Sequence, residues 1–154
     1  MERAMAERRY PNVLLQSFIT GQLAAELLRR ELDAAGMSPN QFGVQSVIGA
    51  FGPLTPTELS TRLGMAPPTV SAWIKRLTED GQVARRPHPT DGRSYLLEVT
   101  AAGREALEAA FPHFGAALTR IEAELGDDLD VAWEGGRRFE EALRAALATS
   151  SALK

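Results

Sequence analysis

The stretch from Met65 to Ser94, MAPPTVSAWIKRLTEDGQVARRPHPTDGRS, carries the strongest structural signal in the chain. Its first half predicts a helix over residues 67–80, because bulky apolar residues recur at the i, i+3, i+4 and i+7 spacing of one helical face. These residues are Val70, Trp73, Ile74 and Leu77. Pro67 suits a first helical turn, where a missing N–H costs nothing, and Gly81 suits the left-handed position that ends a helix.

Two short strand-like runs follow this helix. Residues Gln82–Arg86 form the first, and in the second, Ser94–Val99, every other residue is Tyr, Leu or Val. This alternation is typical of a strand with one buried face. The intervening Pro87–Arg93 has the Pro, Asp and Gly content of a loop. The sequence therefore predicts a hairpin with a protruding tip.

Two capping motifs upstream predict two further helices. Residues 55–58, Thr-Pro-Thr-Glu, have the pattern of a capping box, and Gly64 ends the helix that they open. Residues 38–41, Ser-Pro-Asn-Gln, are a second box, opening a helix that closes near residues 52–53. We expect this helix to turn four apolar side chains toward a core: Phe42, Val47, Ile48 and Phe51. Three helices and a hairpin form a winged helix-turn-helix, a shape that lies on a DNA duplex.

Length, composition and targeting signals limit the class of protein. The chain has 154 residues, 44% of them hydrophobic, which suits one domain with a core. No apolar run approaches 18 residues and the amino end does not resemble a signal peptide, so we expect a cytoplasmic protein. The absence of cysteine excludes disulfides, thiolate metal sites and cysteine-based oxidant sensing.

The charge is distributed unevenly. The net charge is −3, yet residues 54–100 hold six basic and five acidic side chains, whereas residues 101–154 hold six and ten. Arg85, Arg86 and Arg93 gather on the hairpin. We expect a weakly basic face on an acidic protein, with salt-sensitive DNA binding. A purely solvating role for these cations is the alternative.

Long apolar helices are expected on both sides of the winged region. They cover Pro11–Ala35, then Ala101–Leu125 with Thr100 as its cap, and then a stretch from residue 129 to about Ala148. Pro112 predicts a kink or a break in the second. Their apolar faces exceed what the winged region can bury. We therefore assign residues 1–37 and 101–154 to a helical dimerisation region and 38–100 to DNA binding, with an intramolecular bundle as the alternative.

The chain resembles the MarR family of bacterial transcriptional regulators over nearly all of its length. The resemblance rests on residues 38–42 followed by 47–48, on residues 52–55, 58–59 and 63–64, and on 91–93 followed by 99–103. The resemblance implies a mainly α fold with a small β-hairpin, flanked by long dimerisation helices. It also implies a homodimer on a palindromic operator, often released by a small aromatic or phenolic ligand.

The resemblance implies that residues 67–76 form the major-groove helix and that Arg93 is the wing residue that contacts DNA. Together with Arg86 and His88 of the hairpin, the candidate DNA contacts are Pro67, Pro68, Thr69, Ser71, Ala72, Lys75, Arg76, Arg86, His88 and Arg93. Arg93 would enter the minor groove and Asp91 would orient the wing. Ala66 replaces the capping residue common in relatives, and Pro67 and Pro68 remove two of the N–H groups that a helix start offers to phosphate. A phosphate clamp at this helix start should therefore be weak.

Base readout can be predicted from the same helix. We expect thymine methyl groups to meet Pro68, Thr69 or Ala72. Lys75 and Arg76 would then reach a phosphate or a guanine.

No catalytic, cofactor or metal site is expected. His88 and His113 are the only histidines, and no nucleophile turn or glycine-rich phosphate loop is recognisable. Where the long helices meet the DNA-binding unit we expect a ligand pocket, with Gln16, Gln45 and His113 as candidate contacts. Interface or solvent-facing roles for these three residues, and a regulator without a ligand, remain open alternatives.

The leading hypothesis is a dimeric, ligand-responsive transcriptional regulator. A repressor is favoured because blocking a promoter needs no activating surface. A winged helix used only as a protein–protein interaction module is the rival, since a fold does not fix a function, and an enzyme acting on a small molecule ranks third.

Overall fold

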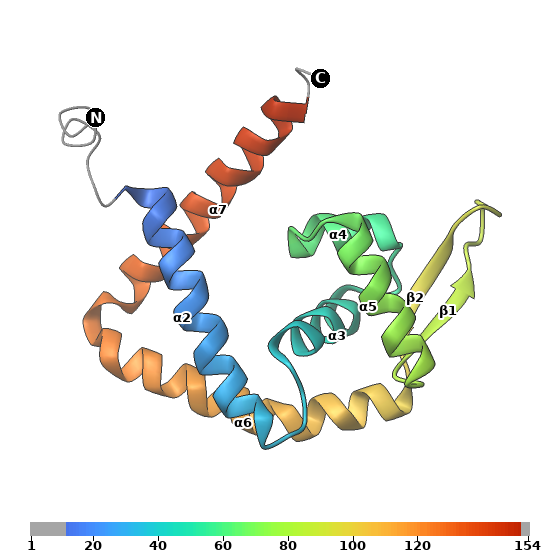
Figure 1. Cartoon of the computed structure of the whole chain (residues 1–154), viewed down its shortest axis with the longest axis horizontal. Coiled ribbons are helices and arrows are strands. Elements are labelled where there is room, and N and C mark those ends of the chain that lie inside the picture. Colours follow the sequence, from blue (N-terminus) through green and yellow to red (C-terminus); the bar gives the residue numbers. More distant parts are fainter. Residues whose placement is uncertain (1–11, 152–154) are drawn as a thin grey trace. The chain divides into compact units, whose positions relative to one another are not determined.

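The computed structural model describes residues 12–151, which are mainly helical with one small hairpin (Figure 1). In chain order the elements are α2 (Val13–Asp33), α3 (Pro39–Phe51), α4 (Pro56–Leu63), α5 (Pro67–Glu79), β1 (Val83–Pro87), β2 (Tyr95–Val99), α6 (Ala101–Leu125), the 3-10 turn η1 (Gly126–Asp128) and α7 (Leu129–Ser151). Two compact units divide the chain, one reaching Ala116 and the other starting at Ala117. Within the described residues, no helix combines the length and apolarity needed to cross a membrane.

The helix boundaries follow local capping chemistry. The N–H of Thr55 donates to Oε2 of Glu58 at 2.7 Å, and the N–H of Glu58 donates to Oγ1 of Thr55 at 3.2 Å. This reciprocal pair is the predicted capping box of α4. Gly64 and Gly81 have φ values of 62° and 70°, which favour glycine where α4 and α5 end.

Helix α3 departs from the prediction in two places. Oγ of Ser38 accepts the N–H of Gln41, but the Gln41 amide donates to Oε1 of Gln82 at 2.9 Å and does not return to residue 38. The second half of that predicted box is therefore wrong. Phe51, expected in the core, is 55% exposed because it is the last residue of α3, and the Arg62 guanidinium lies 4.2 Å from its ring centroid.

The core of the first unit joins the predicted winged region to its flanking helices. Its fully buried side chains include Leu32, Val44, Ile48, Leu59, Val70, Ile74, Leu77, Val83 and Leu97. Three of the four predicted apolar residues of α5 are buried, and the fourth, Trp73, is partly buried against them. Burying this face fixes the rotation of α5 and turns its opposite face outward.

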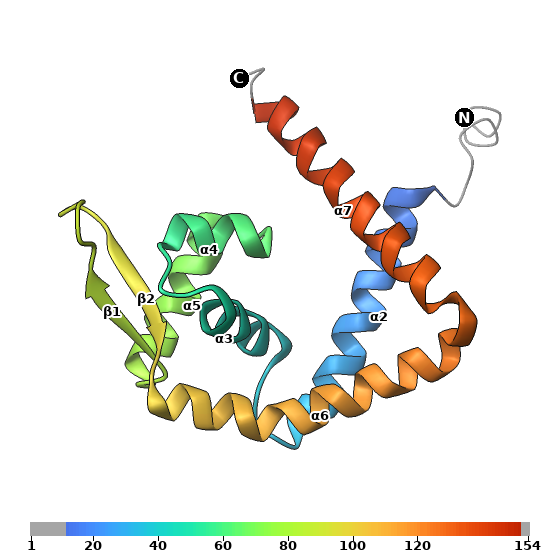
Figure 2. The same ribbon diagram turned by 180° about the vertical axis from the view of Figure 1, so that it is seen from behind.

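Strands β1 and β2 pair in antiparallel register from Val83 opposite Val99 to Pro87 opposite Tyr95. Both strands lie within one residue of their predicted bounds. Leu54 adds an isolated bridge to Leu97, whose N–H donates to the Leu54 carbonyl at 2.9 Å. In both views the tip of the hairpin projects away from α3, α4 and α5 (Figures 1 and 2).

The long helices are close to their predicted extents. Helix α2 occupies Val13–Asp33 of the predicted Pro11–Ala35, of which Pro11 lies outside the described residues. Thr100 caps α6 as expected, with its Oγ1 accepting the N–H of Gly103 at 3.1 Å. Helix α6 continues through Pro112, so the predicted break at this residue is wrong. The helix continues because one proline removes a single N–H donor while the neighbouring turns keep theirs.

Candidate nucleic-acid interface

Helix α5 presents a polar, mostly uncharged face to solvent. The predicted contacts Pro67, Pro68, Thr69, Ser71, Ala72, Lys75 and Arg76 are all exposed. No side chain caps the helix start at Ala66, and prolines occupy the first two helical positions. Because proline has no N–H, this helix start offers fewer donors to a phosphate than an ordinary one.

The two cations of α5 are only loosely held. Nζ of Lys75 lies 3.9 Å from Oε1 of Glu79, and Nε of Arg76 lies 3.9 Å from Oδ2 of Asp80. The Arg76 guanidinium also lies 5.4 Å from the centroid of the Trp73 ring. Exposed pairs of this kind contribute little to stability, so a phosphate can replace the carboxylates as partner.

The three arginines of the hairpin differ in their surroundings. Nε of Arg86 lies 2.7 Å from Oε2 of Glu98, and the Arg85 guanidinium lies 4.7 Å from the Tyr95 ring centroid. Arg93 is exposed, and its guanidinium has no ion-pair partner within residues 12–151. It is therefore the hairpin arginine most readily available to an anionic partner.

Side-chain acceptors organise the tip of the hairpin. Oδ1 of Asp91 accepts the N–H of Arg93, and the Asp91 carbonyl accepts the N–H of Ser94, both at 3.0 Å. Nδ1 of His88 accepts the N–H of Thr90 at 3.3 Å and that of Asp91 at 3.1 Å. The predicted orienting residue Asp91 thus holds the backbone of Arg93, which leaves the guanidinium free to contact a ligand.

The Glu58 carboxylate stabilises the start of α4. Hydrogen bonds from the Thr55 N–H and hydroxyl hold the pKa of the Glu58 carboxyl below its usual range. The positive charge of Arg62 lowers it further. Glu58 is consequently ionised at neutral pH and stabilises the first turn of α4.

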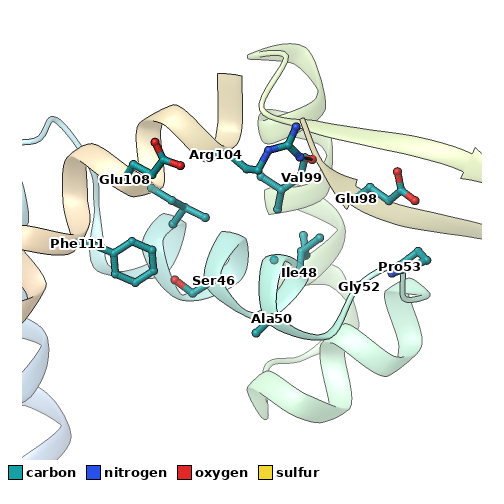
Figure 3. A pocket seen from close by; sticks show the side chains of 12 residues that line it. Ser46, Ile48, Ala50, Gly52, Pro53, Glu98, Val99, Arg104, Glu108 and Phe111 are labelled. Carbon is teal, nitrogen blue, oxygen red and sulfur yellow. Dashed lines mark hydrogen bonds between the residues drawn. The ribbon is translucent and has the colours of Figure 1, made fainter. Parts of the chain in front are cut away.

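A pocket of about 500 Å³ opens between α3, the end of β2 and the start of α6 (Figure 3). Its lining residues are Ser46, Ile48, Gly49, Ala50, Gly52, Pro53, Glu98, Val99, Arg104, Leu107, Glu108 and Phe111. Oγ of Ser46 is buried there without a hydrogen-bond partner in the described part of the chain. Nη1 of Arg104 donates to the Val99 carbonyl at 2.9 Å. The pocket therefore combines an apolar wall with one unused buried hydroxyl.

None of the three predicted ligand contacts lines this pocket. Gln16 is exposed on α2, His113 is half-buried on α6, and the fully buried Gln45 donates to Oε1 of Gln82. Their ligand role stays a prediction. The pocket residues missed from the sequence include Ser46 and Phe111, although the i, i+3, i+4 and i+7 spacing of residues 104, 107, 108 and 111 was a usable signal. Within residues 12–151, no three His, Asp or Glu side chains gather as metal ligands.

Comparison with known proteins connects this geometry to one family. A family model described as MarR family matches residues 35–94. The uncharacterised HTH-type transcriptional regulator YwoH of Bacillus subtilis is 31% identical over 106 residues, which are 69% of this chain and 74% of YwoH. An uncharacterised HTH-type transcriptional regulator of Mycobacterium leprae is 34% identical over 86 residues, 56% of this chain. The chain spans 60% of the length of that relative.

A solved structure extends the similarity beyond the winged region. The Mycobacterium tuberculosis transcriptional regulator MosR, crystallised in complex with DNA, superposes with a TM-score of 0.73 at 25% identity. The superposition covers 90% of this chain and 97% of MosR. The long helices as well as the winged helix are therefore shared with a DNA-binding regulator.

Proposed function

The chain belongs to the MarR family of transcriptional regulators, and from this membership we propose that it is a sequence-specific repressor that binds a palindromic operator as a homodimer. The observation that carries the proposal is the pairing of an exposed α5 face with an Arg93 whose guanidinium has no ion-pair partner among the described residues. A protein acting on chromosomal DNA would work in the cytoplasm. The relatives described above are regulators by name, which gives no support to an enzymatic role.

We propose that α5 lies in the major groove and the hairpin tip in the minor groove. The exposed methyl and ring groups of Pro68, Thr69 and Ala72 suit contact with thymine methyl groups. Arg93 suits a narrow A·T-rich minor groove, where the negative potential is strongest. Because α5 carries few basic side chains that could contact bases, its fit to the shape of the groove would supply much of the sequence specificity.

A library of half-site sequences tests this readout. Pro68→Ala and Ala72→Ser should each change the base preferred opposite the altered side chain, while the overall fold is retained. Unchanged preferences in both variants would mean that base recognition lies elsewhere. Arg120→Ala, in the second compact unit, is a control because no DNA contact is proposed for it.

The homodimer is supported by apolar side chains that the single chain leaves in solvent. On α2 these are Val13, Leu14, Phe18, Ile19 and Leu23, and on α7 they are Val131, Trp133 and Leu147. Trp133 is 73% exposed and Phe18 is 64% exposed. A second copy of the chain would bury these apolar side chains. A twofold axis would also supply two copies of α5 for two operator half-sites.

Release by a small ligand would act through the pocket between α3, β2 and α6. The pocket could accept an aromatic or phenolic body against Phe111 and Leu107, with a polar group directed at Oγ of Ser46. Arg104 holds the Val99 carbonyl, and Thr100 next to it donates through Oγ1 to the Gly81 carbonyl at 2.7 Å. A ligand that moved Arg104 would therefore disturb the residues that end α5.

The proposal is tested by selecting genomic fragments with the purified protein and then screening aromatic compounds for their release. We expect a small set of fragments that share a palindromic A·T-containing motif, bound in a salt-dependent manner. Binding without sequence preference, together with capture of a partner protein through the same face, would favour the interaction-module alternative.

A further inference from the structure

The imidazole of His88 makes three contacts at Nδ1. Nδ1 lies 3.3 Å from the N of Thr90, 3.1 Å from the N of Asp91 and 3.5 Å from Oγ1 of Thr90. A backbone N–H can only donate, so Nδ1 must be the acceptor in both backbone contacts. The ring is therefore neutral with its proton on Nε2, and the hairpin tip itself specifies the tautomer.

The tip depends on these side-chain acceptors because strand pairing ends before it. Strand β1 ends at Pro87, and neither Pro87 nor Pro89 has an N–H to contribute. The N–H groups of Thr90 and Asp91 go to His88, and that of Arg93 goes to Oδ1 of Asp91. A continuous hydrogen-bonded path thus runs from the His88 ring to the backbone of Arg93.

We infer that His88 is the positioning residue of the wing, whose Nδ1 folds the tip so that Asp91 can hold Arg93. The inference rests on the proposed function for its effect on DNA binding, but not for the tautomer. It assigns His88 an indirect role, in place of the direct DNA contact expected from the sequence. Loss of the Nδ1 acceptor should therefore weaken DNA binding because Arg93 is no longer held in position.

Two substitutions separate this role from a direct contact. In His88→Asn the Oδ1 atom occupies the place of Nδ1 and can accept the same N–H groups, and an Asn-Pro pair itself favours a turn. In His88→Gln the side-chain amide reaches toward the place of Nε2 and keeps a donor there, but no acceptor occupies the place of Nδ1. His88→Ala removes both atoms and is the reference for complete loss.

The experiment combines operator affinity with nitrogen-15 NMR of the full chain. Affinity for a selected genomic fragment should fall about tenfold in His88→Ala and His88→Gln, and stay within about twofold of wild type in His88→Asn. Ring nitrogen shifts should show the Nε2–H tautomer in wild type. The Thr90 and Asp91 amide signals should move in the Ala and Gln variants and return toward wild type in the Asn variant.

Rescue by Gln in place of Asn would overturn the inference in favour of a direct contact through Nε2. A protonated Nδ1 at neutral pH, or unmoved Thr90 and Asp91 amides in His88→Ala, would overturn it as well. Because the NMR signals are read without DNA, they decide the positioning role even if the wild type binds no fragment. Failure of the wild type to bind any DNA fragment would count against the proposed function alone.

Discussion

Across the hairpin, Nε of Arg86 lies 2.7 Å from Oε2 of Glu98, so this cation already has an acidic partner. The Arg86 side chain is 66% exposed and that of Glu98 is 26% exposed, which places the carboxylate beneath the guanidinium. A phosphate approaching Arg86 must therefore compete with Glu98. Arg93 faces no such competition from the described residues.

Glu98→Gln should strengthen DNA binding, because it leaves the Arg86 guanidinium without a competing charge. We expect affinity to rise about two- to fivefold for operator and unrelated duplexes alike, and the plot of log affinity against log salt to steepen by about 0.9 per half-site. Fluorescence anisotropy over a salt series measures both quantities.

Glu122→Gln is the matched control for this change, since it removes the same charge from the second compact unit. Equal effects from the two variants would mean that net charge alone is responsible. A fall in affinity in Glu98→Gln would contradict the competition between Glu98 and phosphate.

Local chemistry made the helix-turn-helix predictable. The Thr55 and Glu58 box, the glycines that end α4 and α5, and the apolar spacing of α5 each depend on residues within one or two helical turns. Gln41 was mispredicted because its partner, Gln82, is 41 residues away. Phe51 was mispredicted because helical spacing does not reveal where neighbouring elements stop covering a helix.

The exposed face of α5 and the geometry of the hairpin tip were more predictable than the pocket for the same reason. Exposure on α5 follows from helical periodicity, and Asp91 and Arg93 are close in sequence. The pocket depends on residues from α3, β2 and α6, and the hydrogen bond of the buried Gln45 joins it to Gln82, 37 residues away in the sequence. Polar residues in apolar stretches do not reveal their partners without the fold.

Gly103→Ala should destabilise the protein at the junction of the hairpin and α6. A Cβ at this position would lie 2.1 Å from the Gln82 carbonyl oxygen, a backbone atom that also accepts the N–H of Thr100. We expect the free energy of unfolding to fall by about 3 kcal/mol, as in strongly overpacked sites. Urea denaturation at fixed protein concentration measures the change.

Gly115→Ala on the same helix is the control for helix propensity. A Cβ there meets nothing within 4 Å, so the substitution should raise stability by up to about 1 kcal/mol. Equal effects at the two positions would contradict the close approach of Gly103 to Gln82.

The capping box of α4 should make stability depend on pH through Glu58. Its carboxyl has a pKa below the ordinary value of 4.5 in the folded protein, because the Thr55 N–H and hydroxyl donate to it. Its stabilising contribution is therefore present above pH 4.5 and is lost as the pH falls through the lower folded value. Glu58→Gln lacks this titration.

Urea denaturation of wild type and Glu58→Gln across this acidic range tests the capping interaction. The wild type should lose stability relative to the variant as the pH falls below 4.5. A stability difference that stays constant across the range would show that the folded and unfolded carboxyls titrate alike.

Phe18→Glu should dissociate the proposed dimer by placing a charge where a second chain is expected to cover an apolar ring. Burial of a phenylalanine side chain contributes about 1.5–3 kcal/mol, and each dimer would lose two. We expect the dissociation constant measured by sedimentation equilibrium to rise at least about 100-fold. Phe18→Leu, which keeps an apolar side chain at the same position, should leave the assembly unchanged.

The most direct measurement of the central claim is the affinity of wild type and Arg93→Ala for a selected operator and for an unrelated duplex at several salt concentrations. We predict that the wild type prefers the operator by at least about 1000-fold, and that Arg93→Ala loses at least about tenfold in operator affinity with a shallower salt dependence. Full operator affinity in Arg93→Ala at every salt concentration, or no preference for any sequence in the wild type, would contradict the account.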